Sequence, residues 1–204
     1  MDWATVSALA TGGGTLVLAG TTYASVRSAN RAARVAELSL LAGLRPLIVS
    51  SSVDDRTQVV EFADDTSLTV PGGSAGVKVV DGGVYIALSL RNVGTGIGIL
   101  HGGYVGEQKI GVDDHQPLED FLMLTRDLYL PPGEVGFWQA SFRNDPRRDD
   151  VRALAESGRF SVEILYGDFE GGQRMVTRVA ALKEHERWNL RVARHWHLDR
   201  PSPR

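Results

Sequence analysis

The sequence predicts a mainly β protein, a sandwich or barrel, with a long N-terminal helix and one short inserted helix. Three observations lead to this fold class. No charged side chain occurs from Trp3 to Val26. Beyond residue 45, apolar residues recur at every second position, the period of a half-buried strand. Gly, Asp and Pro separate these runs at short intervals, as in antiparallel β domains.

Composition limits the class of protein further. The 204 residues are 43% hydrophobic and carry a net charge of −3, which suits one domain with a sizeable core. Residues 45–182 include twenty acidic and thirteen basic side chains, and this acidic excess argues against nucleic acid as a partner. The chain has no cysteine, so disulfides, thiolate zinc sites and cysteine nucleophiles are excluded.

Residues 1–44 are predicted to form a transmembrane and juxtamembrane helix. At about 1.5 Å per residue, the 24 residues from Trp3 to Val26 would extend over roughly 36 Å, against about 30 Å for a hydrocarbon core. Glycines and threonines dilute the apolar content, so a buried or frayed soluble helix is the alternative. A cleaved signal peptide is disfavoured because Asp2 stands where a basic region is expected. Apolar residues at helical spacing continue the helix to about Leu41, and Gly43 and Pro46 end it.

The charges that flank this helix predict its orientation. Arg27, Arg31 and Arg34 form a basic collar directly after the uncharged stretch, where they can contact lipid phosphates. Positive charge favours the cytoplasmic side, so a single-pass protein of the cell membrane with a cytoplasmic C-terminal domain is expected. Small residues four apart, such as Ala8 and Gly12, would let two such helices approach, and a homo-oligomer is one expected partner arrangement.

Residues 45–200 are predicted to form the β domain, followed by a short tail, 201–204. The sequence Asp81-Gly82-Gly83 marks a hairpin turn between two alternating runs. The short helix is expected between Asp145, as its cap, and Gly158. The candidate strands are 47–50, 58–63, 68–70, 77–80, 84–90, 97–105, 121–130, 135–142, 160–166, 174–182 and 187–198.

The last strand carries the candidate contact face. Alternation from Arg187 to Leu198 puts Trp188, Leu190, Val192, Trp196 and Leu198 on the core face, with Arg194 as the exception. The opposite, polar face would carry Arg187, Arg191, His195 and His197. The two histidines could bind Zn or Ni if a carboxylate joined them, but two ligands do not make a site, and an exposed polar face is expected instead.

Two other motifs invite a chemical interpretation. Gly72-Gly73-Ser74-Ala75-Gly76 has the spacing of a nucleophile elbow, which requires a helix after the serine, whereas a strand is predicted there. The adjacent aspartates, such as Asp54-Asp55 and Asp64-Asp65, do not match a calcium-binding loop and are expected in turns.

Four segments carry a resemblance to known proteins: residues 1–10, Ser25–Arg34, Leu88–Gly96 and Arg194–His197. They resemble a family of uncharacterised actinobacterial membrane-anchored proteins, which implies architecture and location but no activity. The β domain is similar to immunoglobulin-like sandwiches, in which a strand ending in Asn-x-Gly and a later Pro-Pro-Gly-Glu, here 131–134, are common.

These observations together predict a membrane-anchored, non-enzymatic binding or scaffolding module without a cofactor. Its expected partners are membrane lipid, through the helix, and a protein that the sequence does not identify. The alternatives are a membrane-tethered serine hydrolase that uses Ser74 and a metal-binding module at His195 and His197.

Overall fold

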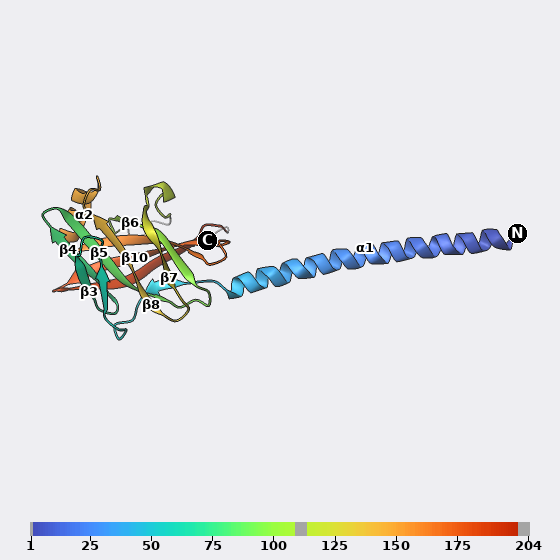
Figure 1. Ribbon diagram of the computed structural model, residues 1–204, viewed down its shortest axis with the longest axis horizontal. Coiled ribbons are helices and arrows are strands. Elements are labelled where there is room, and N and C mark those ends of the chain that lie inside the picture. Colours follow the sequence, from blue (N-terminus) through green and yellow to red (C-terminus); the bar gives the residue numbers. More distant parts are fainter. Residues whose placement is uncertain (1, 109–113, 200–204) are drawn as a thin grey trace. The chain divides into compact units, whose positions relative to one another are not determined.

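The computed structural model describes residues 2–108 and 114–199, without the side chains of 4–11, 38, 41 and 42. The chain divides into two compact units, with the boundary between Gly43 and Leu44. The predicted tail, 201–204, lies outside the described residues. The first unit is the helix α1 (Trp3–Gly43), and the second is the β domain (Figure 1).

The predicted N-terminal helix is confirmed as a helix. It ends at Gly43, three residues before Pro46, as the stop signals predict. Residues 12–37 are all exposed, and their apolar side chains point in all directions rather than along one stripe. Among the described residues, none of the helices combines the length and the apolar content that a membrane span needs. The transmembrane part of the prediction is therefore not supported.

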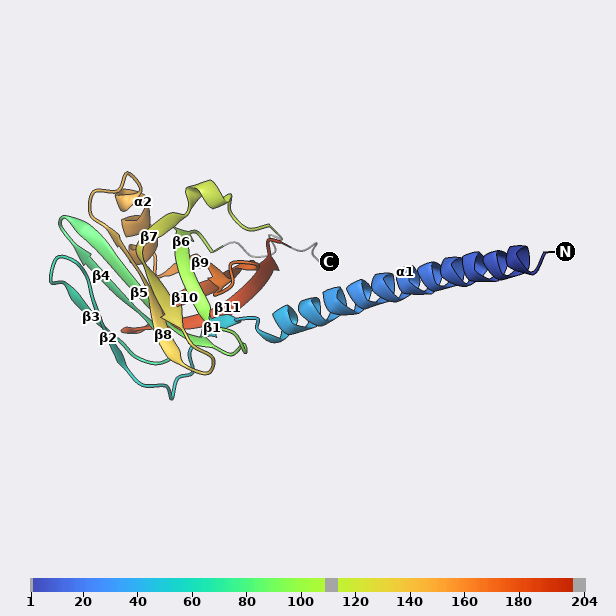
Figure 2. The ribbon, with the colours of Figure 1, turned by 45° about the vertical axis from the view of Figure 1, so that its right-hand side comes forward.

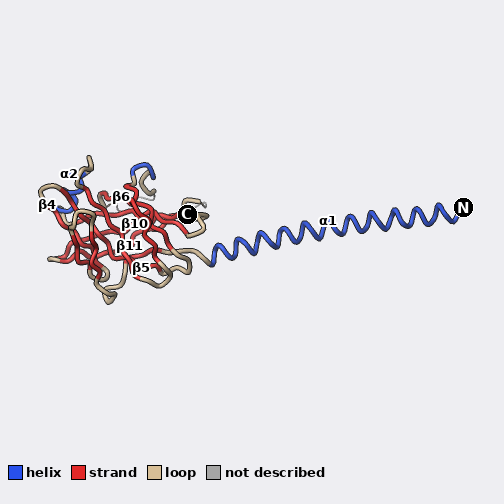
Figure 3. Tube along the Cα trace, viewed as in Figure 1, coloured by secondary structure: helices blue, strands red, loops and turns tan. Residues whose placement is uncertain are grey.

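The described residues of the β domain form eleven strands, and strands are drawn in red in Figure 3. Their ends differ from the predicted ones by a few residues. The strands are β1 (Ile48–Ser50), β2 (Gln58–Glu61), β3 (Ser67–Val70), β4 (Ser74–Val80), β5 (Gly83–Asn92), β6 (Gly98–Gly106), β7 (Leu122–Leu130), β8 (Val135–Phe142), β9 (Arg159–Asp168), β10 (Arg174–Glu184) and β11 (Arg187–His197). The predicted hairpin at Asp81-Gly82 is confirmed, since Val80 of β4 pairs with Gly83 of β5.

Nine of these strands form one antiparallel sheet that curls on itself (Figure 2). The order is β1-β5-β4-β11-β10-β9-β6-β7, with β8 on the other edge of β5. Strands β4 and β1 share one edge of β5, because β4 pairs with Gly83–Leu88 and β1 with Leu90–Asn92. Strands β2 and β3 form a separate hairpin. An immunoglobulin-like sandwich has two distinct sheets, so this continuous sheet does not confirm that finer assignment.

Apolar side chains gather in three clusters. The largest fills the inside of the curled sheet and includes the fully buried Trp138, Phe160 and Tyr166. A second lies between the β2–β3 hairpin and the outer face of β5. The third lies on the outer face of β9 and β10, where Phe121, Leu165 and Val176 are buried. The sheet therefore packs apolar residues on both of its faces.

The short inserted helix, α2 (Arg148–Glu156), begins later than predicted. Asp145 does not cap it; its carboxylate accepts a hydrogen bond from the Arg147 amide, which closes a turn before the helix. Val151 of α2 is buried in the inner core, and Gly158 follows the helix with a positive φ, as its predicted role requires. The helix lies at one end of the curled sheet (Figures 1 and 2).

Candidate functional site

The basic collar occupies one side of α1. Arg27, Arg31 and Arg34 are spaced by four and three residues, so they lie on the same side of the helix, and all three are exposed. None of the salt bridges between described residues includes any of them. The collar is thus available to an anionic surface.

The four residues of the predicted contact face on β11 do not share one face of the sheet, so that part of the prediction is wrong. The register between β10 and β11 shifts between Arg178 and Val179. Arg178 pairs with Arg194 and Val179 pairs with Val192, so Ala193 has no partner in β10. This β-bulge reverses the alternation of the side chains that follow it. His195 and His197 therefore lie on the same face as Trp188, whereas Arg191 lies on the opposite face with Trp196, which packs in the third cluster.

His195 belongs to a buried hydrogen-bond network. Its Nδ1 lies 2.7 Å from the Thr177 hydroxyl, which is also 3.2 Å from Tyr166 Oη and 3.1 Å from the Ile48 carbonyl oxygen. Burial, with a smaller contribution from His197, lowers the pKa of His195, and burial raises the pKa of Tyr166. The network joins strands β1, β9, β10 and β11, so His195 has a structural role in the β domain.

The second histidine does not complete a metal site. A guanidinium nitrogen of Arg45 lies 3.5 Å from His197 Nε2, and Arg45 also donates to Gln173 Oε1 at 3.0 Å. A cation at that distance opposes a metal ion at the same ring. Among the described residues, no group of three His, Asp or Glu side chains is placed to hold a metal ion.

The lowered pKa of His195 predicts a pH-dependent stability. The folded protein favours the neutral ring, so below about pH 6.5 the unfolded chain binds more protons than the folded one. We expect the free energy of unfolding to fall between pH 7 and pH 5, by at most about 1.4 kcal/mol per pH unit. Urea titrations at several pH values measure this slope.

A matched pair of variants assigns the slope to one ring. His195→Asn is expected to flatten the pH dependence between pH 7 and pH 5. His185→Asn changes a turn residue with positive φ that asparagine tolerates, and it should leave the slope unchanged. The carboxylates whose pKa is lowered, Asp55 and Asp199 among them, lose their contribution at lower pH and do not confound this range. An equal slope in all three proteins contradicts the assignment.

Ser74 is buried in a structural contact. It begins strand β4 and is 1% exposed, and its hydroxyl accepts a hydrogen bond of 2.7 Å from Arg187 Nε. A second nitrogen of Arg187 donates to the Gly72 carbonyl oxygen at 2.7 Å. The serine is followed by a strand rather than the helix of a nucleophile elbow. The glycines of this loop have a packing reason, since a Cβ on Gly72 would lie 2.3 Å from the Ser52 carbonyl oxygen.

This geometry makes a prediction for Ser74→Ala. The variant loses one acceptor of the Arg187 guanidinium, so the free energy of unfolding should fall by about 1 kcal/mol in urea titrations. Ser67→Ala, at an exposed position in β3, serves as the control and should be near neutral. Both variants and the unmodified protein should hydrolyse p-nitrophenyl acetate no faster than buffer; a rate that only Ser74→Ala abolishes contradicts this role.

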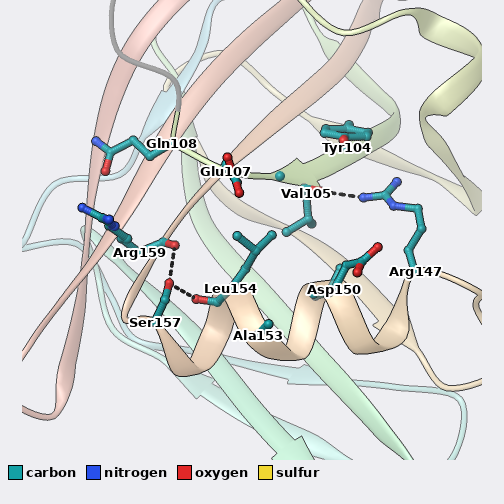
Figure 4. Close-up of a pocket in the computed structure, with 12 residues that line it drawn as sticks. Tyr104, Val105, Glu107, Gln108, Arg147, Asp150, Ala153, Leu154, Ser157 and Arg159 are labelled. Atoms are coloured by element: carbon teal, nitrogen blue, oxygen red, sulfur yellow. Dashed lines mark hydrogen bonds between the residues drawn. The ribbon is translucent and has the colours of Figure 1, made fainter.

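A groove of about 650 Å³ lies between α2 and the end of β6 (Figure 4). Arg147 crosses it, donating to the Val105 carbonyl oxygen at 2.5 Å with its guanidinium 4.3 Å from the Tyr104 ring centroid. The Ser157 hydroxyl oxygen lies 2.8 Å from the Leu154 carbonyl oxygen and 3.1 Å from that of Arg159, within hydrogen-bond distance of both. These bonds hold α2 in place. The sequence does not indicate this groove, because Arg147 stands next to a predicted helix start.

Comparisons with known proteins add little to this geometry. No family model and no curated protein matches the chain. Among solved structures, the chain is similar to a selenomethionine-labelled β-glucosidase from Kluyveromyces marxianus, at 15% identity and a TM-score of 0.22. The alignment covers 59% of this chain and 13% of that chain. At that TM-score, the similarity carries no argument about fold or function.

Proposed function

We propose that this chain is a non-enzymatic binding or scaffolding protein whose helix α1 anchors the β domain at the inner face of the cell membrane. The observation that carries the proposal is the charge pattern of α1. No charged residue occurs between Trp3 and Val26, and three arginines follow on one side of the helix. Such a pattern is typical of a segment that enters lipid with its basic end in the cytoplasm.

The exposure of α1 also supports this proposal. Leu16, Val17 and Leu18 expose 75%, 66% and 68% of their surface, and Gly12, Gly13 and Gly14 weaken the helix in water by about 1 kcal/mol each relative to alanine. An isolated helix with such residues needs a partner for its apolar surface. Because apolar side chains point in all directions, lipid suits the helix better than a single protein surface does.

The contacts of the two candidate reactive side chains, Ser74 and His195, support the non-enzymatic part of the proposal. The Ser74 hydroxyl is bound to Arg187, and the His195 ring is bound to Thr177 inside the domain. Both groups therefore stabilise the fold and do not converge on one site.

Membrane fractionation of cells that express the full-length chain tests the anchor. We expect the protein in the membrane pellet after an alkaline carbonate wash, with the β domain protected from protease in intact spheroplasts and digested after lysis. Reversing the collar with Arg27→Glu, Arg31→Glu and Arg34→Glu should weaken the protection at least severalfold. The matched control, Arg56→Glu, Arg126→Glu and Arg191→Glu, changes three exposed arginines of the β domain and should not.

Each outcome decides part of the proposal. A protein that is wholly soluble before any wash rejects the anchor. A membrane-bound protein whose β domain is digested in intact spheroplasts keeps the anchor but reverses the orientation.

A further inference from the structure

The curled sheet is not closed among the described residues, and two of its open edges belong to consecutive strands, β7 and β8. β7 pairs with β6, and β8 pairs with β5, although only the turn 131–134 separates β7 from β8. Near this turn the strands are close: a Cβ on Gly136 would lie 2.6 Å from Leu130 Cδ1. Further along, where β8 reaches Gln139 and Ser141, they leave a groove of about 420 Å³.

The register of β8 shows which backbone groups border this groove. The Asn92 amide donates to the Glu134 carbonyl oxygen, and the pairing continues without a shift to Val84 and Phe142. Bonded pairs alternate along an antiparallel ladder, so the even-numbered residues of β8 bond to β5. Phe137, Gln139 and Ser141 therefore direct their N–H and C=O groups toward the open edge, where they can pair with another strand.

The free edge of β8 has a wall on each side. On the inner side, Leu122, Leu124 and Leu128 of β7 are only partly buried and continue the apolar core of the sheet. On the outer side, Phe62 and Ala63, at the end of β2, line the groove. A strand added to β8 would direct alternate side chains toward these two walls.

Two polar side chains at the groove, Gln139 and Arg126, can form hydrogen bonds or an ion pair with a ligand. Gln139 lines it, and Gln139 Oε1 is a buried acceptor without a hydrogen-bond partner among the described residues. Unpaired buried acceptors are rare in native proteins, because each costs free energy. Arg126, at the rim, is exposed and takes part in none of the salt bridges between described residues, unlike Arg143, which pairs with Asp64 at 2.9 Å. An N–H donor and a carboxylate would satisfy these groups.

We infer that this groove binds an extended peptide segment of a partner protein, which adds to β8 as a further strand. The segment carries apolar residues at alternate positions, which contact the leucines of β7 on the inner side and Phe62 on the outer side. It also carries an acidic residue that pairs with Arg126. This inference rests on the proposed binding function and names the chemistry of its partner. Main-chain hydrogen bonds supply affinity in this mode of recognition, and the alternate pockets supply specificity.

The walls also favour a single peptide chain over other occupants. A second copy of this domain would present a strand that is already part of a sheet, and the walls on both sides of β8 leave no room for one. An acyl chain could fill the leucine wall but would leave the backbone groups of β8 and Gln139 Oε1 unpaired.

Selection from a synthetic library of random seven-residue peptides, with the full-length protein in detergent as bait, tests the inference. We expect enriched peptides with apolar residues at alternate positions and at least one acidic residue. Fluorescence anisotropy of a selected peptide should give a Kd near or below about 100 μM. N-methylation of its alternate backbone amides, which removes hydrogen-bond donors but keeps the side chains, should weaken binding at least tenfold.

Protein variants complete the design. Ser141→Pro removes one edge N–H without taking a hydrogen bond from β5, because proline is tolerated where the N–H faces outward. It should weaken binding at least tenfold, while Tyr129→Ala, an exposed residue of β7 that does not line the groove, should not. Arg126→Glu should weaken acidic peptides at least threefold.

Four outcomes overturn the inference: no enriched peptide, equal binding of the N-methylated peptide, equal binding by Ser141→Pro, or self-association of the protein that Ser141→Pro abolishes. Competition by a fatty acid that leaves N-methylated and parent peptides equally bound would assign the groove to an acyl chain. None of these outcomes bears on membrane fractionation, so failure of the peptide site and failure of the anchor are distinguishable.

Discussion

Replacing Arg178 by methionine is expected to lower the free energy of unfolding by about 3–5 kcal/mol, because it leaves the carboxylate of Glu163 buried without its partner. The two side chains are 4% and 3% exposed, and Arg178 donates to Glu163 Oε1 at 2.6 and 2.8 Å. Arg178 also donates to the Asp114 carbonyl oxygen, and its guanidinium carbon lies 4.7 Å from the centre of the Trp196 ring. Urea unfolding followed by tryptophan fluorescence measures the loss.

The control for Arg178→Met is Arg174→Met, which removes an exposed partner of Asp199 and should have a much smaller effect. The double variant Arg178→Met and Glu163→Met should regain most of the lost stability, since apolar side chains of similar volume replace both charges. If Arg178→Met costs no more than Arg174→Met, the buried pair contributes no more to stability than an exposed ion pair does.

The second large effect is expected from Asn92→Ala, at about 2–5 kcal/mol of unfolding free energy, because one buried amide satisfies four backbone groups. Asn92 is 0% exposed. Its Oδ1 accepts from the Leu47 and Gly94 amides at 3.1 and 2.9 Å. Its Nδ2 donates to the carbonyl oxygens of Gly96 and Leu130 at 2.7 and 2.9 Å. Thermal and urea unfolding both report the change.

Two substitutions separate hydrogen bonding from packing at this position. Asn92→Asp keeps the acceptor but places a carboxylate beside two carbonyl oxygens, so it should be as harmful as Asn92→Ala. Asn189→Ala, which removes one exposed bond to Glu184, should be close to neutral. A mild effect of Asn92→Asp would mean that shape, rather than hydrogen bonding, decides the role of Asn92.

The sequence predicts local structure well where helix propensity and turn residues decide it without contacts between distant segments. The helix that ends at Gly43 and the hairpin at Asp81-Gly82 need only propensity and turn chemistry, and both are confirmed. The order of the strands depends on pairing between distant segments, which periodicity does not encode. One continuous sheet with an unpaired edge on β8 therefore could not be derived from the alternation.

The candidate site shows a different reason for failure. The contact face on β11 required strict alternation over eleven residues, and one extra residue at Ala193 exchanged the faces. One local signal marks this bulge: under strict alternation the charged Arg194 would lie on the core face, whereas the bulge places it opposite Arg178 on the outer face. The role of Asn92 was visible only as a short motif, since two of its four partners, Leu47 and Leu130, lie in segments far from it in the chain.

The hydrogen bonds between the Asn92 loop and the start of the β domain, here called the clasp, have a mechanical consequence. The chain enters the β domain through residues 45–48, and the loop after β5 grips that stretch: Val93 donates to the Leu47 carbonyl oxygen, and Thr95 donates to that of Arg45. Beyond it, β1 is only three residues long. Any pulling force that travels along α1 would therefore reach this clasp before the long strands. If α1 is a tether, the resistance of the β domain to load depends first on Asn92, on these backbone bonds and on the side chain of Arg45, which donates to Gln173, and only then on the long strands.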